Sequence, residues 1–397
     1  MTSRKGHPEN ARFVNRAAAL SLIRRGGEQS RAEIARKLNL SKMTIGEVID
    51  DLISEGIIKE KGEGSSMKNG GRKPIILQIN NDDHFVIGLD IGLTNTIVAL
   101  GNLKGERIVQ FNSPTNKNHS IENILTQIED FVRMILDKSK VPKSKIIGIG
   151  ISIGGLIDSD TGYIRFSPDF GWKDVPLREL IEQRLSLSTA VDNCTRCMAF
   201  GEQWYEKEFH RKNIFYINLG HGIGSSIVMH GRIYNNNSEF GHIKITNHDV
   251  RCDCGKKGCL EAVASGHAIE RIAKSSIKKT QKTQNLSAKE VAELAIAGNE
   301  EAIRIFSDVG RYLGRAISIA ATLFNPDQVI IAGGVAQARI LFEKAMLNEY
   351  LENTMDVIKN STSICFSSFG IDAGINGCIA MALNKFIFHE EAAAFGE

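Results

Sequence analysis

The first eighty residues are built from short amphipathic runs separated by polar breaks. Apolar residues recur at helical spacing from Phe13 to Leu22, and that run ends at the glycines of 26–27. The next run, SRAEIARKLNL, opens with the serine and glutamate of a capping box, Ser30 and Glu33. In SKMTIGEVIDDLISEG, which Ser41 would cap, apolar residues at i, i+3, i+4, i+7 and i+8 form one continuous face. The pattern predicts three short helices, the last two joined by a tight turn.

Two strand-like runs follow, IIKEKG and KPIILQIN, on either side of a loop rich in Gly, Ser and basic residues. Three helices followed by a hairpin are typical of a winged helix-turn-helix, whose recognition helix enters the major groove while the wing reaches phosphates or the minor groove. The residues expected to contact DNA are Ser30, Arg31, Ser41, Lys42, Met43, Thr44, Glu47, Arg72 and Lys73. The alternative is a three-helix module that binds a protein, and such binding would be insensitive to salt.

From Phe85 onward the chain changes to buried strands interrupted by glycine turns. The strand–turn–strand FVIGLDIGLTNTIVAL is repeated in IFYINLGHGIGSSIVMHGRI, and a third glycine turn occurs in QVIIAGGV. A single glycine turn indicates no more than a hairpin, but two similar units together predict a duplicated, two-lobed α/β fold. Its cleft would be lined by backbone N–H groups that can approach phosphates. The residues of these turns are Asp90, Gly92, Thr94, Gly222, Gly224, Gly333 and Gly334.

The segment GHIKITNHDVRCDCGKKGCLE carries a metal-binding pattern. Three thiolates and one imidazole can complete a tetrahedral zinc site, and four protein ligands leave no position for a catalytic water, so we expect the metal to be structural. The candidate ligands are His242, Cys252, Cys254 and Cys259. His248 is a competing ligand, and free buried cysteines are the alternative. Glu239 and Glu261 flank the segment and could accept hydrogen bonds from a polyhydroxylated ligand.

Composition and charge narrow the class of protein. A length of 397 residues predicts more than one domain, and 42% hydrophobic with 24% charged residues is typical of a soluble globular protein. No apolar run is long enough to span a membrane, and the polar N-terminus does not resemble a signal peptide. An odd number of cysteines, seven, favours a reducing, cytoplasmic location. Residues 1–80 carry a net charge of +6 and the remainder −3, so the head is the part expected to meet a polyanion.

Taken together, these motifs resemble the ROK family (repressors, open reading frames and kinases), sugar-binding proteins of the actin-like ATPase, ribonuclease H-like fold. The resemblance covers nearly the whole chain, and its most specific part is CDCGKKGCLE, which ends in Leu260-Glu261. The other matching motifs are DIGLTNTIVAL, GISIGGLID, SPDFGW, DNCTRCMAFGE, GHGIG and EFGH. The resemblance implies a head at 1–80, a first α/β lobe at 81–192 onto which a C-terminal helix at 376–397 packs, and a second lobe at 193–375 with the zinc segment and a dimer interface.

The resemblance also implies a set of sugar contacts. Carried over by position, they are Gly154, Gly155, Ser167, Trp172, Asn193, Glu239, His242 and Glu261. Trp172 could instead be a hydrophobic anchor. His242 would serve both the zinc and the sugar, which would couple the integrity of the metal site to ligand binding.

Two departures from the family's kinases bear on enzymatic activity. Those kinases have Asn-Asp where this chain has Asn193-Cys194, and a thiol is a poor general base at neutral pH. Asp192 could substitute, although the direction of its side chain is open. The kinases' Asp-x-Gly-Gly-Thr loop is here Asp90-Ile91-Gly92-Leu93-Thr94, so a leucine stands where backbone must approach a phosphate.

The sequence thus predicts a transcriptional repressor that binds operator DNA, responds to a sugar, holds one structural zinc per chain and has no catalytic residues. Reading two half-sites would require a homodimer or a dimer of dimers. The alternative is a bifunctional sugar kinase that retains some ATP-dependent phosphorylation.

Overall fold

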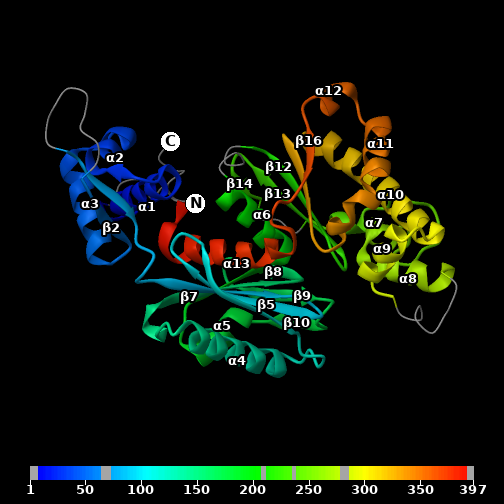
Figure 1. Cartoon of the computed structure of the whole chain (residues 1–397), viewed down its shortest axis with the longest axis horizontal. Coiled ribbons are helices and arrows are strands. Elements are labelled where there is room, and N and C mark those ends of the chain that lie inside the picture. Colours follow the sequence, from blue (N-terminus) through cyan, green and yellow to red (C-terminus); the bar gives the residue numbers. More distant parts are fainter. Residues whose placement is uncertain (1–7, 64–72, 207–211, 235–237, 278–285, 391–397) are drawn as a thin grey trace. The chain divides into compact units, whose positions relative to one another are not determined.

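The computed structural model describes residues 8–63, 73–206, 212–234, 238–277 and 286–390, and it is shown in Figure 1. The chain divides into two compact units, one made of residues 1–193 and 378–397 and the other of residues 194–377. This division does not separate the predicted head from the first predicted lobe. The boundary near residue 80 therefore stays a prediction.

The head has the predicted helices and hairpin, together with a short additional strand. Its elements are α1 (Pro8–Gly26), β1 (Gln29–Ser30), α2 (Arg31–Leu38), α3 (Lys42–Ser54), β2 (Ile58–Glu63) and β3 (Ile75–Ile79). The strands form an antiparallel sheet in the order β1-β3-β2. The helices enclose a core whose fully buried side chains include Leu20, Ile34, Ile45, Ile49 and Leu52. The apolar face predicted for the third helix is confirmed.

The apolar face of α1 differs from the prediction. Its buried side chains are Ala17, Ala19, Leu20 and Ile23, whereas Phe13 is 44% exposed. The ring of Phe13 lies 5.0 Å from that of His389, near the C-terminal end of the described chain. Of the stripe that helical spacing predicted, Phe13, Val14, Ala17, Ala18 and Ser21/Leu22, only Ala17 is buried, so the spacing assigned the buried face of this helix to the wrong residues.

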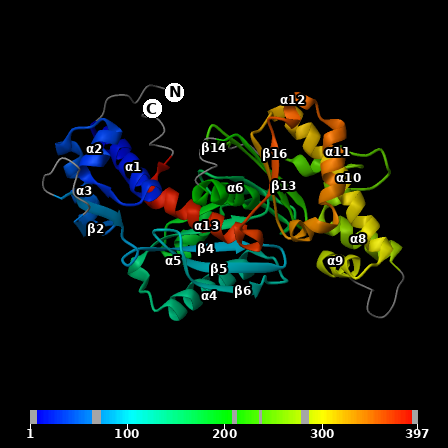
Figure 2. The same cartoon turned by 45° about the horizontal axis from the view of Figure 1, so that its top comes forward.

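Beyond the head, the first unit contains a five-stranded sheet. Its strands are β4 (Phe85–Ile91), β5 (Asn95–Asn102), β6 (Arg107–Pro114), β7 (Ile146–Ile153) and β11 (Thr189–Asn193), in the order β11-β7-β4-β5-β6. The helices α4 (Ile121–Ser139) and α5 (Leu177–Leu185) cover one face, as Figures 1 and 2 show. A smaller antiparallel sheet beside it consists of β8 (Leu156–Asp158), β9 (Tyr163–Ser167) and β10 (Trp172–Val175).

The C-terminal helical segment covers the opposite face of this sheet. It comprises the part of α13 (Ala373–Leu383) from Cys378 onward and the π-helical turn η6 (Asn384–Phe388). The thiol of Cys378 donates to the carbonyl oxygen of Leu89 at 3.2 Å. By length and composition alone, the longer helical stretch Gly370–Phe388 could cross a membrane. However, 72% of it is buried inside the fold. Its apolar character thus agrees with the role of a core helix.

The second unit also contains a five-stranded sheet. Its strands are β12 (Ile214–Leu219), β13 (Ile223–Met229), β14 (Arg232–Ile233), β15 (Gln328–Ala332) and β16 (Ser363–Phe366), in the order β14-β13-β12-β15-β16. Its helices are α6 (Cys194–Tyr205), α7 (Leu260–Ala264), α8 (Gly266–Ser276), α9 (Ala288–Ile296), α10 (Glu300–Phe324), α11 (Glu343–Asn353) and α12 (Asp356–Lys359). Short 3₁₀ turns are η3 (Phe240–His242), η4 (Val335–Leu341) and η5 (Gly370–Asp372).

The two sheets confirm the predicted duplication. In each, the first two strands form an antiparallel pair, β4 with β5 and β12 with β13. The fourth strand, β7 or β15, then pairs in parallel with the first. The same strand order therefore occurs twice in one chain. Both units have the α/β architecture that the repeated strand–turn–strand pattern predicts.

Candidate functional site

The exposed surface of the head begins at the N-terminus of α3. Ser41 caps this helix, and its Oγ accepts a hydrogen bond from the backbone N–H of Thr44 at 3.0 Å. Lys42, Met43 and Glu47 are exposed, Met43 to 76%. An ammonium group can bind phosphate, and an apolar side chain can contact the methyl group of thymine. This end of α3 therefore offers the chemistry of a DNA-reading surface.

Ser30 and Arg31 are placed differently from what the sequence led us to expect. Ser30 is 2% exposed, and its hydroxyl completes the capping box with Glu33 at the start of α2. Because this hydroxyl lies inside the head, we remove Ser30 from the proposed DNA surface. The guanidinium of Arg31 pairs with Asp50 at 2.6 Å and Glu60 at 3.4 Å, so it would have to exchange a carboxylate for a phosphate. In the wing, Lys73 lies 3.6 Å from a carboxylate oxygen, and Arg72 lies outside the described residues.

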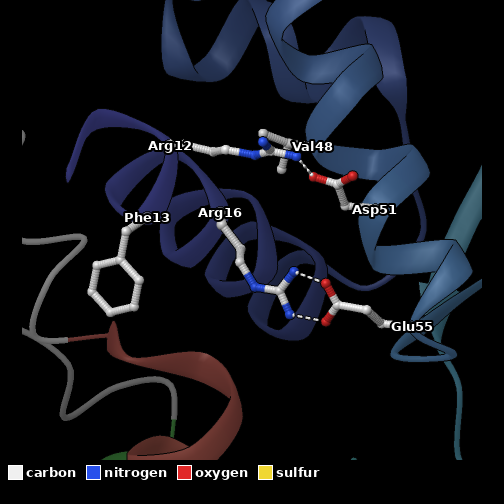
Figure 3. A pocket seen from close by; sticks show the side chains of 6 residues that line it. All are labelled: Arg12, Phe13, Arg16, Val48, Asp51 and Glu55. Carbon is white, nitrogen blue, oxygen red and sulfur yellow. Dashed lines mark hydrogen bonds and ion pairs between the residues drawn. The ribbon is translucent and has the colours of Figure 1, made fainter. Parts of the chain in front are cut away.

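A pocket of about 380 Å³ lies between α1 and α3, on a different part of the head. Figure 3 shows that two arginine–carboxylate pairs, Arg12–Asp51 and Arg16–Glu55, cross from one helix to the other. The second pair is bidentate, with distances of 2.7 and 2.5 Å. These side chains satisfy one another. The pocket contains none of the predicted contact residues, and we assign it no ligand.

In the first unit, the Gly154-Gly155 turn is held by two side chains from the predicted sugar set. The hydroxyl of Ser167 donates to the carbonyl oxygen of Gly154 at 2.6 Å, and the amide of Asn193 donates to that of Gly155 at 2.9 Å. Gly155 has a φ of 137°, and a Cβ there would lie 2.7 Å from the carbonyl oxygen of Phe166. The turn therefore requires glycine. Ser167 is fully buried and acts on this turn rather than on a ligand.

Trp172 is a hydrophobic anchor in this structure. Its side chain is 4% exposed, and its ring lies 5.1 Å from that of Phe170 within the apolar core. The indole N–H donates to the carbonyl oxygen of His119 at 2.6 Å. With its only donor engaged and its ring covered, Trp172 does not offer a surface to a sugar. The anchoring role that the sequence left open describes it better.

Asp169 is a candidate that sequence reasoning missed. It is exposed, and one carboxylate oxygen lies 3.3 Å from the position of a Cβ on Gly154. A carboxylate beside this turn could accept a sugar hydroxyl. The residue is part of SPDFGW, but an exposed acidic residue in a loop carries no periodic signal that would single it out.

The first glycine turn is closed by its own hydrogen bonds. The N–H of Gly92 donates to the carbonyl oxygen of Asn95 at 3.0 Å, and Thr115 donates to the carbonyl oxygen of Gly92 at 2.7 Å. Leu93 is half-buried, and Gly92 and Thr94 are exposed. The turn is therefore a hairpin whose Gly92 N–H, a group that could approach a phosphate, is already engaged.

Two carboxyl groups of the first unit that the sequence singled out are also engaged in hydrogen bonds. Asp90 accepts a hydrogen bond from Ser152 at 2.5 Å, and burial raises the pKa of this carboxyl despite that bond. Asp192 accepts from the backbone N–H of Asn193 at 2.6 Å. Cys194 is the first residue of α6 and is half-buried.

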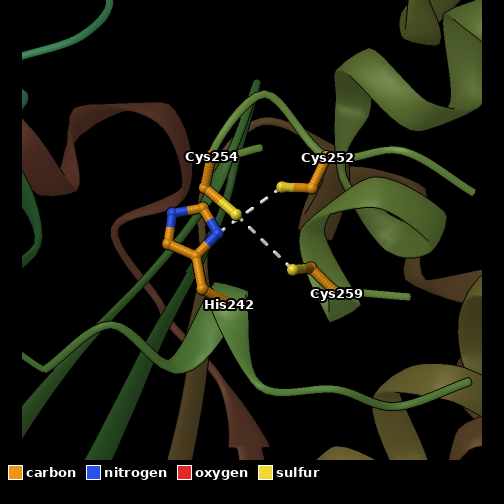
Figure 4. Close-up of side chains that lie close together, drawn as sticks. All are labelled: His242, Cys252, Cys254 and Cys259. Carbon is orange, nitrogen blue, oxygen red and sulfur yellow. Dashed lines mark hydrogen bonds between the residues drawn. The ribbon is translucent and has the colours of Figure 1, made fainter. Parts of the chain in front are cut away.

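In the second unit, the four predicted metal ligands come together, as Figure 4 shows. The Sγ atoms of Cys254 and Cys259 are 3.7 Å apart, and Nδ1 of His242 is 3.6 Å from Sγ of Cys252. A tetrahedral zinc ion with bonds of about 2.3 Å to sulfur and 2.05 Å to nitrogen would separate such pairs by about 3.8 and 3.6 Å. The donor atoms therefore fit zinc in both type and spacing. His248 is exposed and lies outside this cluster.

Burial raises the pKa of two thiols of this cluster, those of Cys252 and Cys259. The pKa of Cys254 is instead lowered, despite some burial, by hydrogen bonds from the backbone of Lys256 and from the neighbouring thiols. Desolvation raises the pKa of Cys252 to about 12, with further contributions from the neighbouring thiols. Without a cation this thiol would stay protonated at neutral pH, whereas a bound metal ion stabilises the thiolate directly. The four side chains are thus arranged so that they could hold a metal ion.

Of the three predicted sugar contacts of the second unit, His242 is itself a candidate metal ligand, and Glu239 and Glu261 lie next to it. His242 has carboxylates on two sides, Glu239 at 3.8 Å from Nε2 and Glu261 at 3.9 Å from Nδ1. Partial burial raises the pKa of Glu239. The electrostatic interaction with His242 lowers this pKa, whereas that with Glu261 raises it. Glu261 also accepts the backbone N–H of Ile223 at 2.8 Å, and a Cβ on Gly222 would lie 2.5 Å from its Oε2. The carboxylate therefore connects the metal segment to the second glycine turn.

The remaining glycines of the second unit lie at the ends of its strands. Gly224 is in β13, where a Cβ would lie 2.2 Å from the hydroxyl of Thr195. Gly333, with a φ of 100°, follows β15 and approaches Asn218 and Leu219, while Gly334 precedes η4. These turns are close-packed, and they do not by themselves demonstrate nucleotide binding.

Two family descriptions match the chain. That of the ROK family matches residues 86–385, and that of a winged helix-turn-helix DNA-binding domain matches residues 17–59. The chain is 29% identical over 400 residues to the xylose repressor of Caldicellulosiruptor bescii. This match covers 96% of this chain and 98% of the repressor. It is 33% identical over 309 residues to a glucokinase of Halalkalibacterium halodurans, covering 74% of this chain and 94% of the kinase.

Solved structures show the same fold. A ROK family transcriptional regulator described as a homologue of the Escherichia coli MLC protein has a TM-score of 0.81 at 24% identity, covering 97% of this chain and 100% of that one. A ROK family glucokinase from Streptomyces griseus, in complex with glucose and AMPPNP, has a TM-score of 0.67 at 24% identity and covers 75% of this chain and 98% of that one. The likeness to the regulator includes the head, whereas that to the kinase covers a smaller part of the chain.

Proposed function

The chain belongs to the ROK family, and from this membership we propose that it is a transcriptional repressor whose affinity for operator DNA changes when a sugar binds. The observation that carries the proposal is the joining of a winged helix-turn-helix head to a sugar-kinase-like α/β fold in one chain. The matching xylose repressor spans nearly the entire chain, whereas the matching glucokinase covers 74% of it. Titrating a complex of the protein and labelled promoter DNA with sugars tests the proposal.

The DNA-binding part of the proposal is centred on the N-terminus of α3. There Lys42, Met43 and Glu47 are exposed, and Thr44 is partly exposed beside the capping hydroxyl of Ser41. Arg31, Lys73 and Arg72 complete the proposed contact set. A basic head of this kind releases counterions from DNA, so binding should weaken steeply as salt increases. A protein partner for the head would not show that dependence.

Replacing Lys42 by Ala should weaken operator binding on the order of 10-fold, because one charge-assisted contact to phosphate is lost. The slope of log affinity against log salt should become shallower by about 1. Fluorescence anisotropy at several salt concentrations measures both quantities. The matched control is Lys117→Ala, which removes an exposed lysine of the first unit outside the head. An unchanged salt slope in Lys42→Ala would remove this residue from the DNA interface.

The sugar-binding part of the proposal rests on polar groups in each unit. The first unit contributes the Gly154-Gly155 turn and the amide of Asn193, and the second contributes Glu239, His242 and Glu261. Carboxylates, an amide and an imidazole are suited to hydrogen-bond sugar hydroxyls. The sugar can alter DNA binding only if it binds the DNA-bound and DNA-free states with different affinity.

We also propose that the Cys/His cluster holds one structural zinc ion per chain. Three cysteines and one histidine would fill a tetrahedral coordination sphere and leave no open position for catalysis. Zinc would stabilise the segment that carries His242 and Glu261. Metal binding and sugar response should therefore be linked.

A repressor of this class would act as a homodimer or a dimer of dimers. Several large apolar side chains of the second unit are strongly exposed, namely Leu323 at 72%, Ile340 at 81%, Met355 at 63% and Val357 at 69%. They lie on α10, η4 and the α11–α12 region. Apolar side chains at such exposure support a protein interface here. A two-fold assembly would present two heads to the two halves of an operator.

The proposal excludes catalysis as the main function. By the family resemblance, Cys194 would stand at the position of the kinases' aspartate, and Leu93 would interrupt the first phosphate loop. None of the seven cysteines forms a disulfide bond, which accords with the reducing, cytoplasmic location that we propose for a DNA-binding regulator.

The kinase alternative is favoured by one observation, the similarity to a glucokinase. We expect no sugar-dependent release of ADP from the wild-type protein, because a general base typically contributes about 10²–10⁴ in rate. The double variant Cys194→Asp with Leu93→Gly should gain measurable activity if the remaining nucleotide groups are intact. A coupled ADP assay compares the two. Sugar-dependent ADP release by the wild type would support the bifunctional kinase instead.

A further inference from the structure

A second group of metal-ligating side chains lies in the second unit, apart from the Cys/His cluster. It consists of His221, on the glycine turn after β12, and of His267 and Glu270, on α8. One ligand atom from each residue lies within 4.8 Å of the others, and the two imidazole rings are 5.2 Å apart. Neither the family descriptions nor the predicted zinc site accounts for this grouping.

The backbone fixes the relative position of the two histidines. The N–H of Gly266 donates to the carbonyl oxygen of Gly220 at 2.8 Å, and the N–H of His267 donates to that of His221 at 3.0 Å. The start of α8 is further fixed by Ser265, whose hydroxyl accepts the N–H of Ala268 at 3.1 Å. The turn and the helix are thus joined by two successive backbone hydrogen bonds, one of which links the two histidines themselves.

Glu270 is the third potential ligand beside the two histidines. It is three residues after His267 on the same helix, which places both side chains on one face. One of its oxygens accepts the N–H of Ala288 at 3.1 Å, an interaction that orients the carboxylate as outer-shell hydrogen bonds do in metal sites. The neighbouring cation, Arg271, is directed to the carbonyl oxygens of Arg251 and Ala262.

The spacing permits coordination after a small movement of side chains. Ligands on a tetrahedral ion with bonds of about 2.1 Å lie about 3.4 Å apart, compared with the upper limit of 4.8 Å found here. Both histidines are exposed and Glu270 is half-buried, so rotation of the imidazoles can close the difference. The same exposure leaves coordination positions open to water, so the metal should exchange readily.

We propose that His221, His267 and Glu270 form a second, exchangeable site for a divalent transition-metal ion. Two imidazoles and one carboxylate suit Zn²⁺, Ni²⁺, Co²⁺ or Cu²⁺ rather than Mg²⁺ or Ca²⁺. A bound ion would connect the glycine turn to α8. Because Ile223 at the end of that turn donates to Glu261, the ion would also stiffen the backbone next to a proposed sugar contact. The binding itself does not depend on the repressor function.

The test is a titration of the untagged, zinc-loaded full chain with Ni²⁺, followed by calorimetry and by metal analysis after equilibrium dialysis. The wild type should bind one Ni²⁺ per chain while its zinc content stays constant. Loss of an outer-shell group costs about 10–100-fold in metal affinity, so removing a direct ligand in His267→Ala should cost on the order of 100-fold or more. His221→Ala should behave in the same way, and Glu270→Gln should weaken binding as well.

The matched control is His248→Ala, which removes an exposed histidine of the same unit that lies outside both groups. It should leave Ni²⁺ binding unchanged. With Cu²⁺ as the probe, electron paramagnetic resonance should show coupling to two imidazole nitrogens in the wild type and to one in His267→Ala. Ni²⁺ binding that survives both His221→Ala and His267→Ala, or that is lost equally in His248→Ala, would overturn the proposal. So would the absence of Ni²⁺ binding beyond the zinc site in the wild type.

Discussion

Replacing Glu261 by Ala should leave operator binding intact and raise the sugar concentration needed for a half-maximal response by on the order of 10–100-fold. Hydrogen bonds to a charged group contribute about 1.5–3 kcal/mol, and every 1.4 kcal/mol corresponds to a factor of ten. The carboxylate also accepts the N–H of Ile223 at 2.8 Å, so its removal frees the second glycine turn. Anisotropy of labelled operator DNA, titrated with sugar, measures the shift.

Two further variants separate the roles of this carboxylate. Glu261→Gln retains an oxygen that can accept from Ile223 but lacks the negative charge, so it should lose less than Glu261→Ala. Glu352→Ala, an exposed glutamate on α11, should respond like the wild type. If the sugar response of Glu261→Ala equals that of the wild type, Glu261 is not a sugar contact.

Replacing Cys259 by Ser should remove zinc and destabilise the unit that holds it. Cys259 is 1% exposed, precedes α7 and is one of the four clustered candidate ligands. A ligand present at about 1,000 times its dissociation constant stabilises the folded state by about 4.1 kcal/mol. For a unit of this size that corresponds to a fall in melting temperature on the order of 10 °C. Metal analysis and calorimetry measure the two effects.

The control for Cys259→Ser is Cys365→Ser, which changes a partly buried cysteine of the same unit that is not in the metal cluster. It should retain one zinc per chain. A cysteine thiol must lose its proton to bind zinc, so acidification should release the metal. The wild type should hold its zinc down to a lower pH than a variant whose zinc coordination is weakened. An unchanged zinc content in Cys259→Ser would contradict the assignment of the site.

The effects of Cys259→Ser and Glu261→Ala are linked through His242, which is both a candidate metal ligand and a neighbour of Glu261. This side chain lies 3.6 Å from Cys252 and 3.9 Å from Glu261, so loss of the metal should also displace the proposed sugar contact. We therefore expect Cys259→Ser to lose its sugar response as well as its zinc. Glu261→Ala, in contrast, should respond only at higher sugar concentration and retain the metal.

The parts of the fold that follow from local chemistry could be predicted from the sequence. Capping serines placed the starts of α2 and α3, and the apolar spacing of α3 indicated its buried face. The repeated strand–turn–strand pattern predicted two similar sheets, which the identical strand orders confirm. The four candidate metal ligands could be picked out because their residue types and spacing are rarely combined for another purpose, and the structure brings them together.

Other features depend on tertiary contacts that carry no local signal. The strand β1 has only two residues and forms by pairing with β3. Phe13 is apolar at the expected position, yet it contacts His389, which is distant in sequence. Carrying over residues by family position identified Trp172 and Ser167 but could not show that both are buried and engaged. Residues such as Asp169 and His267 become candidates only when the fold shows their neighbours.

The most direct test of the central claim is fluorescence anisotropy of DNA from the protein's own promoter region, titrated with the zinc-loaded protein and then with a panel of common sugars. We predict specific, salt-sensitive binding to the DNA and a change in affinity caused by one sugar, with that change shifted to higher sugar concentration in Glu261→Ala. Specific DNA binding that none of the sugars alters, or a sugar effect that is identical in Glu261→Ala, would contradict the account.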